Sequence, residues 1–106
     1  EPIEILGAHP DERVVLARET ESRRIVGFVS AVGDGVLTAF VPLLEVLPEH
    51  QGQGIGTELM RRVLALLEDR YMVDLCCDDD LVEFYERLGM SRLNGMALRT
   101  PGAIPT

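Results

Sequence analysis

The segment EHQGQGIGTELM, residues 49–60, constrains the fold most, because it places glycines at 52, 54 and 56 directly before an amphipathic stretch. Apolar residues in that stretch fall at 59, 60, 63, 64, 66 and 67, which is the spacing of one wide helical stripe. The start of a helix leaves about four backbone N–H groups without partners and carries roughly half a positive charge. Glycines just before it let a ligand approach the backbone closely. The segment therefore predicts an anion site, most often for phosphate.

Three phosphate-binding patterns compete for this loop. The P-loop pattern needs a lysine, and it is excluded because all 10 basic residues of the chain are arginines. The dinucleotide pattern G-x-G-x-x-G fits in part, since Gly52 and Gly54 supply two glycines while Thr57 takes the third place. Asp74 or Asp78 lies at a suitable distance for a ribose contact. A dinucleotide-binding domain is the weaker alternative, because the loop is long for that turn and the chain is short for a doubly wound sheet.

The rest of the chain reads as short strands and helices, without repeats or linkers. Pro42 lies inside an apolar run, so the strand there is expected to be broken, bulged or at an edge. The Asn94-Gly95 pair between two apolar pieces is a strong hairpin signal. We predict strands at 13–19, 25–32, 36–47 and 72–77, helices at 57–70 and 81–88, and a hairpin within 90–99.

The ends of the second helix carry their own signals. Asp80 and Glu83 have the spacing of a capping box, and Gly89 stands where a C-cap glycine belongs. The resulting order, β-β-β-α-β-α-β-β, combines an antiparallel meander with one right-handed strand–helix–strand crossover. It predicts a single α+β domain over residues 1–106, with a mixed sheet of the α/β type.

The net charge and the composition of the chain limit the partners that it can be expected to have. The net charge of −8 argues against broad nucleic-acid binding and is compatible with a cationic acceptor. No apolar run is long enough to span a bilayer, so no membrane partner is expected. The N-terminus lacks the layout of a signal peptide, so the expected location is the cytoplasm. Adjacent Cys76 and Cys77 give neither a disulfide framework nor zinc spacing, and we expect buried thiols and no metal.

The third pattern, Q/R-x-x-G-x-G/A, is matched in full by Gln51, Gly54 and Gly56. At this point the sequence resembles the GNAT superfamily, the acyl-CoA-dependent N-acyltransferases. LLEVLPEHQGQGIGTELM resembles the central strand, pyrophosphate loop and following helix of the family, and LVEFYERLGM resembles its tyrosine segment. The resemblance covers roughly residues 13–99 and implies a GNAT-like fold. In that fold the central strand parts from its parallel neighbour and leaves a V-shaped gap in the sheet.

The resemblance implies that acetyl-CoA is the cosubstrate and that its pantetheine arm lies in this gap. The Val46 N–H would lie near the thioester carbonyl and stabilise its developing negative charge. Main-chain N–H groups of the glycine loop would hold the pyrophosphate, and Asp78 stands where many members have asparagine. The residues expected to bind the cosubstrate are Leu44, Val46, Leu47, Gln51, Gly52, Gln53, Gly54, Ile55, Gly56, Thr57 and Asp78.

The resemblance also suggests catalytic roles. Tyr85 matches the tyrosine that lies near the sulfur and can protonate the leaving thiolate. Glu45 is the preferred general base for the acceptor ammonium, with His50 as the second candidate. His9 has no evident role. The expected reaction is direct transfer of the acetyl group from acetyl-CoA to a primary amine of a small molecule or a protein.

A departure from the family at the N-terminus leaves alternatives open. The family has a strand and two helices before its first hairpin, whereas about a dozen residues precede Arg13 here. The N-terminal helices are therefore expected to be reduced or absent, and a non-catalytic acyl-CoA-binding or interaction module is the alternative function. A second copy could cover the sheet surface left at the last hairpin and the short N-terminus, which makes a homodimer one expectation.

Overall fold

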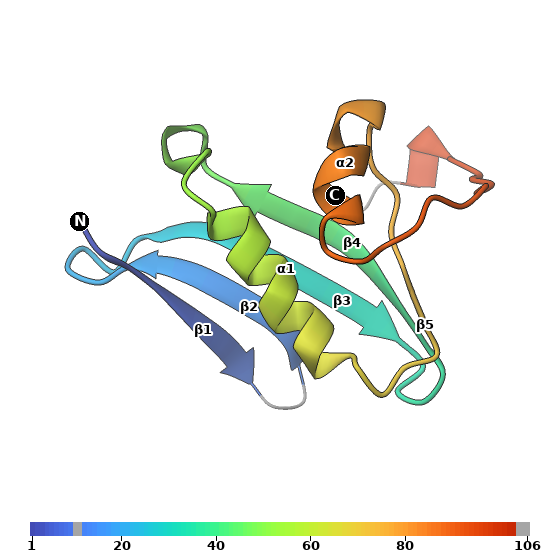
Figure 1. The fold of residues 1–106 in the computed structure, drawn as a ribbon, viewed down its shortest axis with the longest axis horizontal. Coiled ribbons are helices and arrows are strands. Elements are labelled where there is room, and N and C mark those ends of the chain that lie inside the picture. Colours follow the sequence, from blue (N-terminus) through green and yellow to red (C-terminus); the bar gives the residue numbers. More distant parts are fainter. Residues whose placement is uncertain (10–11, 104–106) are drawn as a thin grey trace.

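The computed structural model describes residues 1–9 and 12–103, which form one mixed sheet with two helices (Figure 1). The strands follow one another in space in their chain order, and every neighbouring pair is antiparallel except the last, β4 and β5, which is parallel. The strands are β1 (Ile3–His9), β2 (Glu12–Glu19), β3 (Ile25–Gly33), β4 (Thr38–Val46) and β5 (Met72–Asp74). The helices are α1 (Ile55–Leu66) and α2 (Val82–Glu86), with 3₁₀ turns at Pro48–His50, Asp79–Leu81 and Pro101–Ala103.

The N-terminal strand β1 is not among the strands predicted from the sequence. It pairs with β2 from Ile3 opposite Glu19 to Gly7 opposite Val15. Its alternating Ile3 and Ile5 pack against the core, which is the period-2 signal of a half-buried strand. Among the described residues, β2 is the next element after β1, and no helix is described between them. The expectation that the N-terminal helices are reduced or absent therefore holds for this connection.

The core lies between α1 and the middle of the sheet, where Figure 1 shows α1 crossing β2, β3 and β4. The side chains of Leu59, Met60 and Val63 on α1 are completely buried. They meet Val15 and Val29 of the central strands, which are also buried. The helix runs over 55–66 instead of the predicted 57–70, and the apolar spacing that predicted it is the stripe that it buries.

Gly27 on β3 lets α1 approach the sheet closely. A Cβ at this position would lie 3.0 Å from the carbonyl oxygen of Glu45 and 3.3 Å from Cδ1 of Leu59. We therefore expect Gly27→Ala to lower the free energy of unfolding by about 1–2 kcal/mol through overpacking, measured by urea denaturation. Gly7→Ala is the matched control, because a Cβ on this β1 glycine would meet no atom within 4 Å. Equal stability of the two variants would contradict close packing at Gly27.

Strand β4 has a bulge at the point where the gap in the sheet begins. Ser30 lies opposite Leu43 and Val32 lies opposite Phe40, so Val41 and Pro42 together face the single residue Ala31 of β3. This confirms the expectation of an irregularity at Pro42. On its other side β4 pairs with β5 only from Thr38 to Phe40, and the two strands then separate. The predicted V-shaped gap is therefore present beyond Phe40.

The region after α1 differs from the prediction in extent. The last strand ends at Asp74 instead of residue 77, and α2 spans 82–86 instead of 81–88. The proposed capping box is absent, since no side chain caps the start of α2 or of the 3₁₀ turn before it. Gly89 does end the helix in the left-handed conformation with φ of 93°, as predicted. Its N–H donates to the carbonyl oxygen of Glu86 at 3.0 Å, which is a C-cap hydrogen bond.

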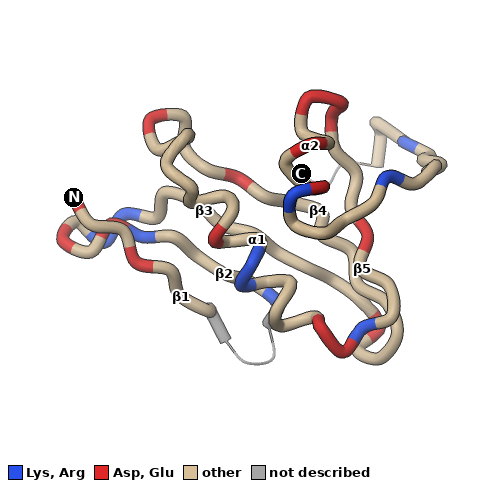
Figure 2. The backbone as a smooth tube through the Cα atoms, in the orientation of Figure 1, with Lys and Arg blue, Asp and Glu red and all other residues tan. Residues whose placement is uncertain are grey.

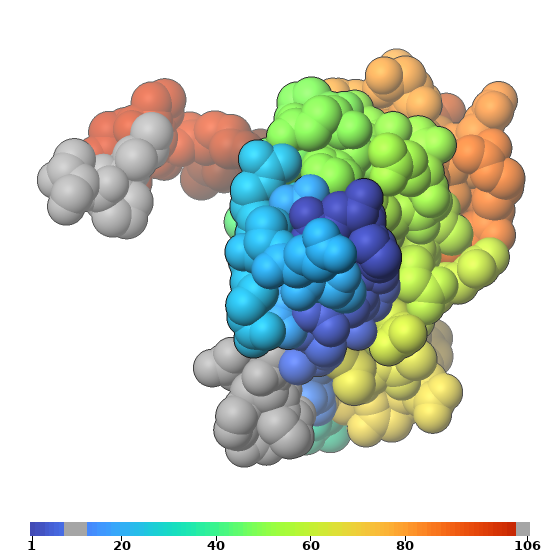
Figure 3. Space-filling view, turned by 90° about the vertical axis from the view of Figure 1, so that its left-hand side faces the viewer, coloured from blue at the N-terminus to red at the C-terminus, as the bar shows by residue number. Residues whose placement is uncertain are grey.

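The predicted hairpin within 90–99 is wrong, because residues 91–100 contain no strand. Leu93, Met96 and Leu98 are 73%, 100% and 91% exposed, so the apolar pieces that suggested strands have nothing to pack against. An isolated two-stranded hairpin is marginal in water without such packing. Figure 3 shows this C-terminal segment standing off the body of the molecule.

Candidate active site

The glycine loop leaves a run of main-chain N–H groups free before α1. Gly52 and Gly54 have φ of 78° and 85°, which is the left-handed region, and Gly54 is the N-cap of α1. Within the described chain, no hydrogen bond uses the N–H groups from Gly52 to Thr57; the next one, of Glu58, donates to Gly54. These amides and the positive end of the α1 dipole can together receive an anionic group.

Gln51 was expected to bind the cosubstrate, but its N–H groups form hydrogen bonds within the protein. Its main-chain N–H already donates to the carbonyl oxygen of Pro48 at 3.3 Å. Its side-chain Nε2 donates to the carbonyl oxygen of Val46 at 3.0 Å. Gln51 therefore ties the loop back to the end of β4, and the free amides begin at Gly52. The sequence pattern located the loop correctly and could not reveal this internal use of the glutamine.

The hydrogen-bond ladder between β3 and β4 decides which backbone groups of β4 face the gap. The N–H of Leu47 donates to the carbonyl oxygen of Val26 at 2.8 Å, so this pair is a hydrogen-bonded pair of the ladder. Because such pairs alternate along antiparallel strands, the N–H groups of Leu44 and Val46 point away from β3. They face the side that β5 has left. Of the predicted backbone contacts, the N–H groups of Leu44 and Val46 are thus free for a ligand, whereas the Leu47 N–H is used within the sheet and the Val46 carbonyl oxygen is bonded to the Gln51 side chain.

A cleft of about 240 Å³ occupies the gap between β4 and the segment that leads from β5 to α2. It brings together four of the residues that were expected to bind the cosubstrate or to act in catalysis: Leu44, Glu45, Asp78 and Tyr85. Glu45 and Asp78 are exposed, and Figure 2 shows the acidic run 78–80 in the turn before α2. The remaining lining residues are Val41, Pro42, Leu43, Cys76, Cys77 and Leu81.

The two cysteines correct the sequence interpretation, which placed them in the core as buried thiols. Both are free and exposed, and both line the cleft. The physical reason is the short β5, which ends at Asp74 and leaves the following residues without a strand partner. An apolar run such as LCC is typical of a buried strand, and only the early separation of β5 from β4 exposes it.

Tyr85 reaches the cleft from α2 and is half-buried there. Its ring packs edge-on against Phe84, with ring centroids 4.9 Å apart and an interplanar angle of 81°. Phe84 lies close to the start of α1, because a Cβ at Gly56 would be 3.8 Å from its Cζ. Burial raises the pKa of Tyr85 above its ordinary value, and the negative charge of Cys77 adds to the increase. The phenol is therefore protonated at neutral pH and can donate a hydrogen bond into the cleft.

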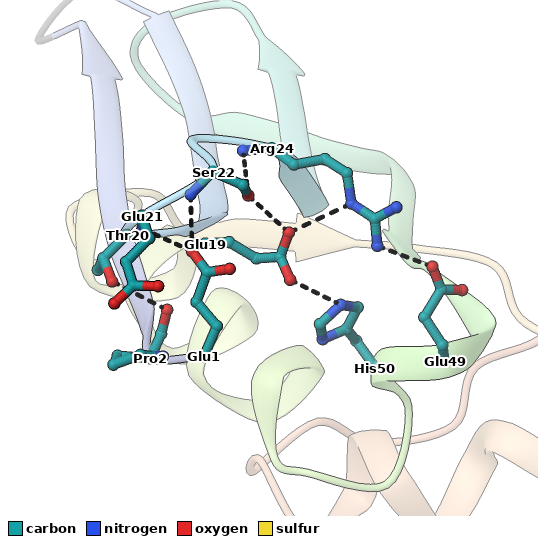
Figure 4. Close-up of polar contacts among 9 residues, drawn as sticks. All are labelled: Glu1, Pro2, Glu19, Thr20, Glu21, Ser22, Arg24, Glu49 and His50. Carbon is teal, nitrogen blue, oxygen red and sulfur yellow. Dashed lines mark hydrogen bonds and ion pairs between the residues drawn. The ribbon is translucent and has the colours of Figure 1, made fainter.

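His50, the second candidate base, lies elsewhere. Its Nε2 is 3.6 Å from Oε2 of Glu19, and both side chains are largely buried (Figure 4). The Glu19 carboxylate also accepts a hydrogen bond from the Ser22 hydroxyl at 2.8 Å and lies 3.3 Å from Nε of Arg24. Arg24 in turn reaches Glu49 at 2.9 Å, next to His50. This cluster fastens the turn before the glycine loop to the β2–β3 hairpin, and it places His50 outside the cleft.

The described residues give two further observations on binding. They contain no group of His, Cys, Asp and Glu side chains arranged to hold a metal ion. Neither helix within them has the length and apolar character that crossing a membrane requires. The candidate site consists of the free backbone amides, the open edge of β4, and the side chains of Glu45, Asp78 and Tyr85.

Known proteins resemble this chain over much of its length. An uncharacterized N-acetyltransferase from Prochlorococcus marinus is 37% identical over 68 residues, which are 62% of this chain and 38% of that protein. A histone acetyltransferase from Glycine max is 34% identical over 71 residues, which are 65% of this chain and 31% of that protein. A crystal structure from Deinococcus radiodurans R1, assigned as an acetyltransferase, has a TM-score of 0.79 and 54% identity, over 88% of this chain and 66% of that one.

The chain thus spans less than two thirds of the length of each of these proteins. The sequence profile of the acetyltransferase (GNAT) family matches residues 2–90. That range includes the glycine loop, the bulged β4, the cleft and Tyr85. The chain therefore belongs to the acetyltransferase (GNAT) family.

Proposed function

We propose that this chain is an acetyl-CoA-dependent N-acetyltransferase that transfers the acetyl group directly to a primary amine. The observation that supports this most is that the free N–H groups of the glycine loop follow the free N–H groups of β4 along the chain. The unbonded amides from Gly52 to Thr57 follow the strand whose Leu44 and Val46 N–H groups face the side that β5 has left, and Leu44 lines the cleft there. A diphosphate bound at the first group would direct an extended arm along the second, toward Tyr85.

When bound, acetyl-CoA supplies a thioester whose carbonyl carbon is open to attack by an amine. The Val46 N–H would donate to the carbonyl oxygen, where negative charge develops in the transition state. Glu45 would accept a proton from the acceptor ammonium, directly or through water. Tyr85 would donate a hydrogen bond to the sulfur as it leaves. Glu45, the chain neighbour of Val46 on β4, and Tyr85 on α2 line the same cleft, so the acceptor and the thioester would be held together.

The acceptor is a primary amine on a small molecule or a protein, and the acidic residues around the cleft favour a cationic one. Relatives illustrate both classes of acceptor by their names, a histone acetyltransferase from Glycine max and a serotonin N-acetyltransferase from Oryza sativa. A cytoplasmic location, a homodimer and the lack of nucleic-acid or membrane partners stay predictions.

Acetyl-CoA is expected to stabilise the folded chain by about 2.7 kcal/mol at a hundredfold excess over its dissociation constant. Thermal unfolding with and without the ligand measures this effect, and NAD serves as the matched nucleotide control. With a panel of primary amines, the enzyme should release free CoA thiol, which a colorimetric thiol assay detects. Stabilisation without thiol release for any amine would favour the non-catalytic acyl-CoA-binding module. Stabilisation by NAD alone would favour the dinucleotide-binding domain.

Glu45→Gln is expected to remove the acidic limb of the pH–rate profile that the general base produces. The glutamine keeps the shape of the side chain at the cleft wall and cannot take the proton of the ammonium. The measurement is kcat/KM for a primary amine across the acidic range. Glu68→Gln is the control, because Glu68 is an exposed carboxylate that does not line the cleft. An unchanged acidic limb in the Glu45 variant would exclude this residue as the base.

A further inference from the structure

Two thiols line the cleft in which the proposed function places a third. Cys76 and Cys77 are the only 2 cysteines of the chain, and both are free and exposed. Both belong to the cleft wall, together with Tyr85 from α2 and Glu45 from β4. The proposed reaction would bring the sulfur of the cosubstrate to this same wall, next to the Tyr85 hydroxyl.

The two cysteines differ in their relation to Tyr85. The charge of Cys77 acts on the titration of the Tyr85 phenol, whereas no such effect comes from Cys76. Cys77 and Tyr85 line the same cleft, and Cys77 is the cysteine whose charge raises the pKa of Tyr85. Both thiols are accessible, and access to the reagent is a condition for exchange between a cysteine and a disulfide.

Resting on the proposed function, we propose that Cys77 is a modification site that forms a mixed disulfide with the thiol of CoA. The disulfide form of CoA supplies the oxidising equivalent. The Cys77 thiolate attacks one sulfur of that disulfide, the S–S bond of the reagent breaks, and a new S–S bond forms between the Cys77 sulfur and the attacked CoA sulfur. The second CoA leaves as a thiolate and takes a proton from the solvent, which has received the proton of Cys77. Cys77 is oxidised and the departing CoA is reduced, so the exchange balances.

The adduct would hold CoA where acetyl-CoA must bind, and it would therefore block acetyl transfer. Binding of the nucleotide part at the glycine loop would bring the reagent to Cys77 and raise the local concentration of the disulfide. A disulfide without the nucleotide lacks this advantage. A reducing thiol would reverse the adduct and restore the enzyme, which makes the modification a reversible response to oxidation.

Intact-mass measurement of the whole chain tests this assignment. Wild type, Cys76→Ser and Cys77→Ser are treated with CoA disulfide or with glutathione disulfide at equal concentration. We expect CoA disulfide to label wild type and Cys76→Ser about tenfold faster than glutathione disulfide does, or more. Excess acetyl-CoA should remove that advantage, and Cys77→Ser should lack it. In wild type, the labelled fraction should lose acetyl-transfer activity and regain it with dithiothreitol.

The outcomes separate this inference from the function on which it rests. Equal labelling rates for the two disulfides, or an advantage that persists in Cys77→Ser, would overturn the assignment of Cys77. If acetyl-CoA stabilises the same sample in thermal unfolding, that failure would leave the proposed function intact. Absence of both the stabilisation and the rate advantage would remove the proposed function together with the modification site.

Discussion

Tyr85→Phe is expected to lower kcat for acetyl transfer about a hundredfold while leaving acetyl-CoA binding intact. The phenol lies in the cleft wall and is protonated at neutral pH, and the phenylalanine keeps the ring that packs edge-on against Phe84. Only the hydrogen bond to the leaving sulfur is lost. Steady-state kinetics with a primary amine measures kcat, and thermal unfolding with acetyl-CoA measures binding. Tyr71→Phe is the control, because Tyr71, the only other tyrosine, is 82% exposed and does not line the cleft.

The raised pKa of Tyr85 limits what its hydroxyl does in this step. An ordinary phenol has a pKa of about 10 and an ordinary thiol about 8.5, so full proton transfer to a thiolate is uphill by about 2 kcal/mol. Burial and the Cys77 charge increase that gap. The group therefore acts as a hydrogen-bond donor to the developing negative charge, and solvent supplies the proton afterwards.

The pH dependence follows from the same shift. Because burial raises the pKa of Tyr85, the phenol stays a hydrogen-bond donor to a higher pH than an ordinary tyrosine does. In the kcat profile of wild type we therefore expect any alkaline limb from Tyr85 to have its midpoint above about pH 10, the ordinary value. Wild-type kcat in the Tyr85 variant would exclude the residue from the mechanism.

The sequence was sufficient to locate the site because its signals are local. The glycine loop, the α1 stripe and the Gly89 helix end each depend on residues within a few positions of one another. The Pro42 bulge is of the same kind, since a proline cannot donate to a ladder. These features predicted the loop, the helix and the irregular strand, whereas the gap and the role of Tyr85 were expected from the resemblance to the GNAT superfamily.

The errors come from contacts between distant segments. Exposure of Cys76 and Cys77 depends on where β5 leaves β4, and no residue of the LCC run signals that point. The absence of the last hairpin depends on the lack of a surface for Leu98 and its neighbours to pack on. The position of His50 depends on its contact with the Glu19 carboxylate at the end of β2. These two residues are far apart in the sequence, so no local pattern predicts the contact.

Gly54→Ala is expected to weaken CoA binding about a hundredfold, which corresponds to about 2.7 kcal/mol. Alanine is strained at φ of 85°, by about 1–2 kcal/mol, so the loop would relax toward a conformation that turns its amides away. A hydrogen bond to a charged group contributes about 1.5–3 kcal/mol, so losing one or two of them accounts for the effect. Isothermal titration calorimetry with CoA measures the affinity.

The matched control for this strain is Gly35→Ala in the turn between β3 and β4. Gly35 has φ of 81°, a Cβ there would meet no atom within 4 Å, and the residue is remote in sequence from the glycine loop. This variant should lose a similar free energy of unfolding and keep the affinity of wild type for CoA. A second ligand, acetyl-pantetheine, lacks the diphosphate, so its affinity should be the same in wild type and Gly54→Ala. An unchanged CoA affinity in Gly54→Ala would show that the free amides from Gly52 to Thr57 do not hold the diphosphate, and the cleft would then need another explanation.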